Sequence, residues 1–353
     1  MSSSRYPIAS PMTGEVLIAA DVGGTHARIA SIVPATEGGK AAFAIGDYCK
    51  YACADYPSLG AIIGAFRSSH ANSPSSSVAL AIAGFVVDDA VVNRNLPWSV
   101  SISGLRHDLG LRELAVVNDF KAVAYAVGHI GNDESTLLCG PAQRQAGPLL
   151  VVGPGTGLGG AVHIPHGDHP VILATELGQA TLAATSEAEF AVLAELRKRH
   201  PRVLIEQVLS GTGLVNLDVA VRALRGAPAI SRSAAQISAA ARDGSDPIAV
   251  ETVEIFCAWF GALLGDLAMM YGAQGGIYIA GGVLPQMRDL LVRSRFVERF
   301  LDKGEMHEAL TRIPVRLVDH AQLGVIGAAS WYFDRSFESH RAAGAEAPTR
   351  SAR

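Results

Sequence analysis

Asp119 has the clearest potential for proton transfer in this chain, and Asn118 stands directly before it. Both follow the apolar segment ELAVV and precede the helix-forming segment KAVAYAV, so we expect them where a strand ends and a helix begins. In open α/β sheets, ligands bind at that edge. A carboxylate can take a proton from a hydroxyl group, and an amide can donate and accept hydrogen bonds. The pair predicts a site for a polyhydroxylated substrate, with helix N-capping as the alternative role.

Two segments of the chain, Leu17–Ile32 and Leu149–Ile164, repeat one design of apolar strand, glycine–threonine loop and second strand. Backbone N–H groups in such loops are open to phosphate oxygens because no side chain covers them. A tight hairpin turn would explain one loop. Two loops, one in each half, predict a two-lobed protein that holds a polyphosphate from both sides. The loop residues are Gly23, Gly24 and Thr25 in the first segment and Gly153, Gly155, Thr156 and Gly157 in the second.

The second loop also matches the dinucleotide-binding pattern G-x-G-x-x-G between Gly155 and Gly160. That pattern indicates a dinucleotide site only when a helix follows the loop. Here the segments GAVHI and HPVILAT follow, and they read as a β-hairpin across the turn-like PHGD. The context therefore favours the phosphate loops of actin-like ATPases and sugar kinases.

Asp21 directly precedes the first loop, where a carboxylate would repel bound phosphates unless a cation lay between them. We therefore expect Asp21 to hold Mg²⁺, through water, with capping of its own turn as the alternative. Arg28, just beyond the loop, has the charge to neutralise phosphate, or it forms a surface ion pair.

Two further carboxylates, Glu176 and Glu206, stand in apolar or glycine-bearing surroundings. A carboxylate in such surroundings needs hydrogen-bonding partners, and the hydroxyl groups of a sugar would serve. Taken singly, each is explained as well by a surface or ion-paired glutamate.

The composition of the chain limits the classes of function that it can have. The 353 residues carry a net charge of −4, with 49% hydrophobic and 18% charged residues, as in a well-buried globular protein of about two domains. A small negative net charge gives no sign of a basic surface that binds nucleic acid. The start lacks the apolar core of a secretory signal, and the most apolar run, Ile255–Tyr271, is too short for a membrane span. Four scattered cysteines form neither zinc-site pairs nor a disulfide framework, so we expect a cytoplasmic protein with no membrane partner.

Strands and helices alternate along the chain, which predicts α/β lobes with mixed sheets. We expect a small domain over residues 15–128, a large domain over residues 129–326, and a C-terminal helix near 327–340 that returns to the small domain. A buried core helix is predicted from about Pro247 to Tyr271. Residues 1–14 and 341–353 have too little apolar content to pack, and we expect them to be disordered.

The motifs DVGGTHAR, NDFKAV, GPGTGLGG, SEAEF, EQVLSGTGLVNL, GGIYIAGGVLP and the late GVIGAA resemble, in this order, those of the bacterial ATP-dependent glucokinases of the non-repressor type. The resemblance covers residues from about Leu17 to Tyr332. It implies the two-lobed actin-like ATPase/hexokinase fold, an α/β fold with a ribonuclease H-like sheet in each lobe. It also implies a homodimeric enzyme of carbohydrate metabolism that uses ATP and Mg²⁺ to phosphorylate glucose at its 6-hydroxyl group, with two domains that close over the sugar.

The resemblance assigns roles to individual residues. Asp119 would be the base that faces the sugar's 6-hydroxyl group, and Gly281 and Gly282 would belong to the adenosine motif, with a strand-end turn as the alternative reading. The two glycine–threonine loops would hold the phosphates of ATP. The sugar ligands would be Asn95, Asn118, Asp119, Glu176, Gln179 and Glu206.

This chain departs from the family pattern at two positions. Where the family reads Glu-Gly-Gly-His, this chain reads Glu176-Leu177-Gly178-Gln179, and Phe85 stands where the family commonly has proline. A glutamine amide can still donate and accept, but its reach differs from that of histidine. A kinase for a different hexose or an amino sugar therefore stays open, as does a weakly catalytic sugar-sensing regulator. Nothing supports an actin-like filament or chaperone ATPase.

Overall fold

The computed structural model describes residues 4–8, 16–70, 75–92, 96–131, 134–167 and 169–345. The chain divides into two compact units. Unit 1 is drawn from Met1–Ile130, His166–Val171 and Ala321–Arg353, and unit 2 from Gly131–Pro165 and Ile172–His320. The domain limits that the sequence predicts, 15–128 and 129–326, stay predictions.

Unit 1 is built on a six-stranded mixed sheet in the order β1-β4-β3-β2-β5-β9. The chain between β5 and β9 forms a second, three-stranded sheet in the order β6-β7-β8. Its strands are β1 Arg5–Pro7, β2 Leu17–Val22, β3 His26–Glu37, β4 Lys40–Ala52, β5 Ser77–Ile82, β6 Phe85–Val87, β7 Ala90–Val92, β8 Val100–Ser101 and β9 Glu113–Asn118. Its helices are α1 Leu59–Ser69, α2 Ile102–Asp108, α3 Asp119–Ala126 and α11 Leu323–Ala345.

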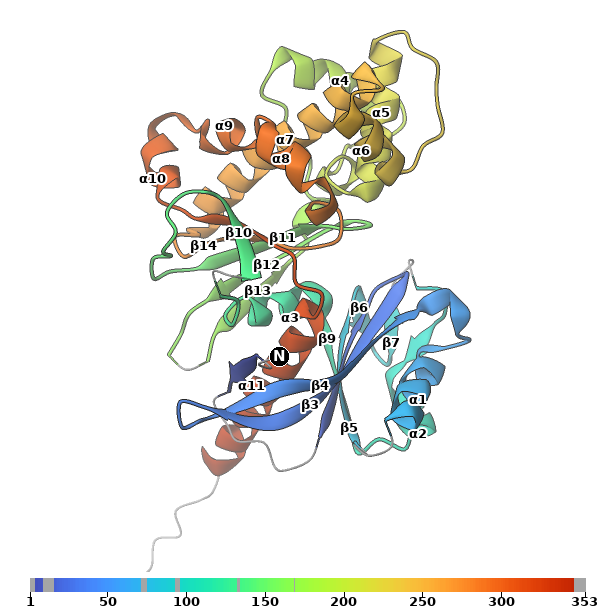
Figure 1. The fold of residues 1–353 in the computed structure, drawn as a ribbon, viewed down its shortest axis with the longest axis vertical. Helices are drawn as coiled ribbons and strands as arrows, with labels where there is room; N and C mark the ends of the chain where they lie inside the picture. The colour runs from blue at the N-terminus through green and yellow to red at the C-terminus, as the bar shows by residue number, and fades with distance from the viewer. Residues whose placement is uncertain are drawn as a thin grey trace, which may run out of the picture. The chain divides into compact units, whose positions relative to one another are not determined.

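Both faces of the unit 1 sheet are covered, as the continuous apolar runs of β2 and β5 require. Successive side chains of a strand point to opposite faces. Ile18 and Val78 pack into one core with Ile62 of α1. α11 packs along the sheet strands β2, β5 and β3 and against α3, an arrangement visible in Figure 1.

The first strand differs from the expectation that residues 1–14 are disordered. Arg5–Pro7 forms β1, which pairs with β4 in antiparallel register. Tyr6 is 3% exposed because its ring contacts Phe43, at a centroid distance of 5.1 Å, and His129. At the other end of the chain, α11 continues to Ala345, beyond the predicted helix, and the rest of the predicted disordered tail lies outside the described residues.

Unit 2 contains a second six-stranded mixed sheet, in the order β10-β15-β14-β11-β12-β13. Its strands are β10 Ser135–Cys139, β11 Leu149–Pro154, β12 Leu158–Ile164, β13 Val171–Thr175, β14 Gly276–Ile279 and β15 Val315–Val318. Its α-helices are α4 Glu187–Arg197, α5 Gly211–Leu224, α6 Ala234–Asp243, α7 Pro247–Tyr271, α8 Arg288–Arg293, α9 Phe296–Leu301 and α10 His307–Thr311. The short 3₁₀ turns η3 Leu177–Gln179 and η4 Ile205–Gln207 connect several of these elements.

Helix α7 organises the unit 2 core and has the predicted limits. Asp246 caps its start by accepting a hydrogen bond from the Ile248 N–H at 2.9 Å, and Gly272 ends it in a left-handed conformation. Phe256 and Phe260 are fully buried; their rings stack on each other, and Phe260 also stacks on Phe296 of α9. By length and composition α7 could cross a membrane, but 67% of its most apolar window is buried in the protein. Burial of this kind is typical of a core helix.

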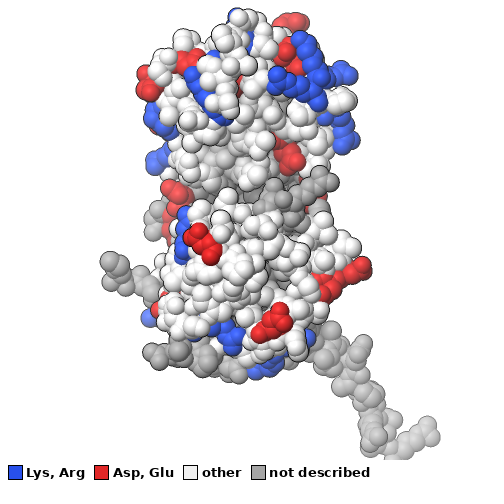
Figure 2. Space-filling model, turned by 90° about the vertical axis from the view of Figure 1, so that its right-hand side faces the viewer, with Lys and Arg blue, Asp and Glu red and all other residues white. Residues whose placement is uncertain are grey.

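Charged side chains are sparse on one face of the molecule. On the face drawn in Figure 2, acidic and basic side chains are interspersed among a majority of uncharged residues. This distribution agrees with the low charged fraction and the small net charge of the sequence.

The close contact between α11 and α3 predicts that a methyl group added at the contact destabilises the protein. A β-carbon at Gly327 would lie 1.9 Å from the Ala122 carbonyl oxygen, so the helices must separate to admit it. We expect Gly327→Ala to lower the free energy of unfolding by about 1–3 kcal/mol in urea titrations. Gly64→Ala in α1 is the matched control, because nothing lies within 4 Å of its β-carbon. That control should raise stability by about 0.5–1 kcal/mol, and equal effects of the two substitutions would contradict the packing argument.

Candidate active site

In unit 1, three parallel strands end at one edge of the sheet. β2 pairs with β5, which pairs with β9, and Val22, Ile82 and Asn118 stand in the same register. Neighbouring strands lie about 4.8 Å apart. The first glycine–threonine loop, the turn after β5, and Asn118 with Asp119 therefore leave the sheet side by side. This is the ligand-binding edge that the sequence predicts for Asp119.

Asn118 and Asp119 begin helix α3. The Asn118 Oδ1 atom accepts a hydrogen bond from the Lys121 N–H at 3.1 Å and so caps the helix, the role that stood as the alternative at this position. The Asp119 carboxylate accepts the Phe120 N–H at 2.9 Å and is partly exposed. The N-terminal end of α3 also places partial positive charge beside this carboxylate. With Oδ1 engaged, the Asn118 amide nitrogen is the atom suited to donate to a ligand.

Asp21 is held at the end of β2 by neighbours from distant parts of the chain. Its carboxylate lies 3.4 Å from the Arg28 guanidinium, and its side chain is 21% exposed. Gly324, in the first turn of α11, approaches so closely that a β-carbon there would lie 2.3 Å from the Asp21 Cγ atom. Burial raises the pKa of the Asp21 carboxyl above its ordinary value, and Arg28 opposes that rise. The carboxylate is therefore short of positive charge.

One carboxylate that is short of positive charge fits Mg²⁺ held mainly by waters and phosphates. Within the described ranges, no group of three or more His, Cys, Asp or Glu side chains gathers to form a metal cage. The donor set at Asp21 thus suits a loosely held magnesium ion.

The first loop forms a tight turn between β2 and β3. The Gly23 N–H donates to the His26 carbonyl oxygen at 3.0 Å, and the Cys53 N–H donates to the Thr25 carbonyl oxygen at 2.9 Å. The Thr25 hydroxyl lies 3.1 Å from the His26 Nδ1 atom, on an exposed residue. β3 follows the loop, as the sequence predicts, so the loop does not start a helix.

The second loop joins β11 to β12, and the N-terminus of α5 braces it. The Gly155 N–H donates to the Gly157 carbonyl oxygen, and the Gly211 N–H donates to the Gly155 carbonyl oxygen, each at 2.8 Å. The Thr212 hydroxyl donates to the Thr156 carbonyl oxygen at 3.3 Å. A strand again follows the loop, which agrees with the exclusion of a dinucleotide site. A helix N-terminus beside a glycine loop is a favourable place for phosphate.

Gly281 and Gly282 leave the sheet beside the second loop, because β14 and β11 pair in parallel. The Ala280 N–H donates to the Val152 carbonyl oxygen at 2.9 Å, and the Val283 N–H donates to the Pro154 carbonyl oxygen at 3.3 Å. Gly281 has φ +95°, and a β-carbon there would lie 2.7 Å from the Pro154 oxygen. The structure thus requires glycine at this position for backbone packing.

Glu176, Gln179 and Glu206 form a cluster on two short 3₁₀ turns. The Gln179 Nε2 atom donates to the Glu206 Oε1 atom at 2.7 Å, across 27 residues of sequence. The Gln179 N–H donates to the Glu176 carbonyl oxygen at 2.9 Å. Partial burial and the charge of Glu206 both raise the pKa of the Glu176 carboxyl. The cluster reaches the second loop, because the Leu158 N–H lies 3.4 Å from the Glu206 Oε2 atom.

The structure groups the predicted residues by unit. Unit 1 brings together the first loop, Asp21, Asn118 and Asp119. Unit 2 brings together the second loop, the Gly281–Gly282 motif and the carboxylate cluster. Asn95 and the side chain of Phe85 lie outside the described part of the structure, so their predicted roles stay predictions.

Two supporting features were missed at the level of sequence. Gly211 and Thr212, which brace the second loop, belong to a second Gly-Thr-Gly sequence, and that repetition is a signal that could have found them. Gly324 carries no such signal, since its importance comes from its proximity to Asp21.

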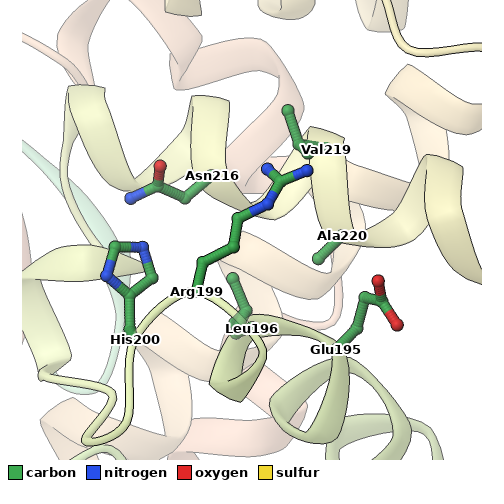
Figure 3. Close-up of a pocket in the computed structure, with 7 residues that line it drawn as sticks. All are labelled: Glu195, Leu196, Arg199, His200, Asn216, Val219 and Ala220. Atoms are coloured by element: carbon green, nitrogen blue, oxygen red, sulfur yellow. The ribbon is translucent and has the colours of Figure 1, made fainter.

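A shallow pocket between α4 and α5 lies apart from these residues. Figure 3 shows Arg199 and His200, just after α4, facing Asn216 on α5. The lining residues are Glu195, Leu196, Arg199, His200, Asn216, Val219 and Ala220. None of the predicted site residues is among them.

The sequence model of the family described as Glucokinase matches residues 18–335. A glucokinase-like protein from Xylella fastidiosa is 46% identical over 319 residues, which cover 90% of this chain and 95% of that protein. A glucokinase from Paramagnetospirillum magneticum is 39% identical over 323 residues, which cover 91% of this chain and 98% of that protein.

Similarity to a solved structure supports the same assignment. The crystal structure of a glucokinase from an Antarctic psychrotroph has a TM-score of 0.79 and 36% sequence identity, and the match covers 90% of this chain and 98% of that one. The predicted α/β fold of the actin-like class, with one large mixed sheet in each part, is confirmed.

The environment of Asp21 predicts how stability depends on pH. A carboxyl group whose pKa is raised in the folded state favours folding most when it is protonated, and it weakens the fold as pH rises through the folded pKa. We therefore expect Asp21→Asn to raise the melting temperature at pH 7 without ligands, and the gain to shrink as the pH is lowered. Thermal melts across that range measure both effects.

Arg28→Met is the matched control, because it removes the charge that opposes the pKa rise of Asp21. It should lower the melting temperature at pH 7. A fall in stability for Asp21→Asn at pH 7 would contradict the unfavourable burial of this carboxylate.

Proposed function

The chain belongs to the glucokinase family of enzymes, and we propose that it transfers the γ-phosphoryl group of ATP to the 6-hydroxyl group of glucose. The observation that carries the proposal lies in unit 1. There Asp119, Asp21 and the first loop leave neighbouring parallel strands at one sheet edge. A hydroxyl-activating carboxylate and a phosphate-binding turn at one edge are the parts that phosphoryl transfer to an alcohol requires.

Asp119 acts as the base in this mechanism. The transition state of phosphoryl transfer is loose, with little bond to the attacking oxygen, so positioning and charge neutralisation supply most of the rate acceleration. The Asp119 carboxylate accepts a hydrogen bond from the sugar's 6-hydroxyl group, orients that oxygen and takes its proton late in the transfer. The Asn118 amide nitrogen donates to the sugar while its oxygen caps α3.

The nucleotide is held chiefly by backbone. The Gly23 and Gly155 N–H groups close their own turns, and the N–H groups of Gly24, Thr25, Thr156 and Gly157 bind phosphate oxygens. The N-terminus of α5 adds its dipole beside the second loop. Gly282 leaves room for the adenosine, since it carries no side chain, and Gly281 lets the same turn pack closely against Pro154.

Asp21 holds Mg²⁺ through water in this proposal. The ion, when bound, neutralises charge on the phosphates. Arg28 limits the cost of the buried carboxylate in the protein without ligands.

Glu176, Gln179 and Glu206 bind the ring of the sugar, with Asn95 as a further ligand. The hydrogen bonds from the Gln179 amide and the Leu158 N–H orient the Glu206 carboxylate, and Glu176 and Glu206 accept hydrogen bonds from sugar hydroxyl groups in this proposal. By its family membership we also propose a homodimer that works in the cytoplasm.

Replacement of the base is the primary test. Asp119→Asn keeps the shape of the side chain but removes the proton acceptor. We expect it to lower kcat by about 10²–10⁴-fold in a coupled ADP assay, with the Michaelis constants for glucose and ATP nearly unchanged.

Asp108→Asn, at an exposed carboxylate that ends α2, is the matched control and should keep wild-type turnover. Near-normal turnover of Asp119→Asn would remove Asp119 from its role. Glucose binding without ATP turnover in the wild-type protein would instead favour the sugar-sensing regulator.

Two glycines of the second loop separate sugar binding from nucleotide binding. A β-carbon at Gly157 would lie 2.7 Å from the Glu206 Oε2 atom, whereas one at Gly155 would meet nothing within 4 Å. Gly157→Ala should therefore displace Glu206 and lower kcat/KM for glucose by up to about a hundredfold, the equivalent of about 1–3 kcal/mol. Gly155→Ala should change the glucose parameters far less. Equal losses for glucose in the two variants would contradict the role of Glu206.

A further inference from the structure

One face of the unit 1 sheet carries basic side chains next to the first loop. Cys49 and Tyr51 of β4 pack against the core that contains α1, so Lys50 between them lies on the opposite face. Arg28 of β3 stands opposite Lys50 in antiparallel register and shares that face. His26 lies on it too, because it is two residues before Arg28 on the same strand. The three side chains therefore lie together where β3 begins and β4 ends.

The end of β4 touches the first loop directly. The Cys53 N–H, three residues after Lys50, donates to the Thr25 carbonyl oxygen at 2.9 Å. Burial lowers the pKa of His26, and the charge of Lys50 lowers it further. The His26 Nδ1 atom in turn lies 3.1 Å from the Thr25 hydroxyl oxygen. The charge of Lys50 therefore acts at the loop.

Arg28, the basic residue that the sequence offers for phosphate, is engaged elsewhere. Its guanidinium lies 3.4 Å from the Asp21 carboxylate and also faces the Tyr48 hydroxyl. Lys50, by contrast, is exposed, and it forms no ion pair with any residue that the structure describes. The first loop thus has an ammonium group beside it whose charge no neighbouring carboxylate neutralises.

We propose that Lys50 binds the phosphates of ATP at the first loop, together with the Gly24 and Thr25 N–H groups. This inference rests on the proposed kinase function and deepens it, because that proposal leaves the phosphates to backbone N–H groups and a magnesium ion. Backbone N–H groups carry only partial charges, whereas an ammonium group adds a full positive charge and three donors. Lysine binds phosphate as a point charge, and such charge-assisted hydrogen bonds are roughly twice as strong as neutral ones. All of these residues belong to unit 1.

The test measures the Michaelis constants of the full chain with Mg·ATP and glucose. Lys50→Met keeps the length of the side chain but removes its charge. We expect it to raise KM for ATP at least about tenfold and to leave KM for glucose nearly unchanged. A smaller rise in KM for ATP overturns the inference, and so does an equal rise in KM for glucose.

Two further variants separate charge at the loop from a general effect. Lys198→Met is the matched control, because this exposed lysine of unit 2 pairs with Glu195 and its loss changes the net charge equally. It should keep the wild-type KM for ATP. Lys50→Arg retains the charge, so its KM for ATP should lie closer to that of the wild type than to that of Lys50→Met. The opposite order overturns the inference.

A readout that does not depend on turnover tests where the Lys50 ammonium lies. Removal of a positive neighbour raises the pKa of a histidine, so an NMR titration of His26 should give a higher pKa in Lys50→Met than in the wild type. The melting temperature of Lys50→Met should stay close to that of the wild type, because the side chain is exposed. A pKa of His26 that stays unchanged overturns the inference.

The results also distinguish this inference from the proposed function. Phosphorylation of glucose that depends on Asp119, with a KM for ATP that Lys50→Met does not change, overturns the inference alone. If the wild-type chain shows no turnover that depends on Asp119, the proposed function is overturned and the inference with it.

Discussion

The parallel pairing of β2, β5 and β9 is the constraint on which the unit 1 site depends. Hydrogen bonds between these strands place Val22, Ile82 and Asn118 in one register. The residues that follow each strand must therefore emerge at the same edge, although almost a hundred residues separate Asp21 from Asp119. A shift of one residue in this register would turn Asp21 to the opposite face of the sheet, because successive side chains alternate. The register of the sheet therefore decides which side chains of unit 1 lie together at this edge.

In unit 2, the candidate site residues are held by backbone segments that approach one another closely at glycines. The second loop touches the start of α5 through Gly155 and Gly211, and the turn after β14 through Gly281. Gly157 leaves space for the Glu206 carboxylate, which in turn holds Gln179. Backbone contacts of this kind keep donors and acceptors rigid, which favours binding of a ligand into a preorganised site.

Both units keep carboxylates short of positive charge. Asp21 and Glu176 each have a raised pKa, in the first case from burial and in the second from partial burial and a neighbouring carboxylate. Such groups cost stability in the protein without ligands, and perturbed carboxyl groups of this kind cluster at functional sites.

The sequence by itself determined the residue types and most of the elements. Apolar periodicity predicts α7, the strand–loop–strand segments and the strand before Asp119, because those signals lie within a few residues of one another. Tertiary structure alone decided that Tyr6 is buried against Phe43 and His129, that Gly324 approaches Asp21, and that Gln179 binds Glu206. Each of these contacts joins residues that are distant in the chain. Desolvation and hydrogen bonding depend on neighbours in space, so no local pattern could reveal them.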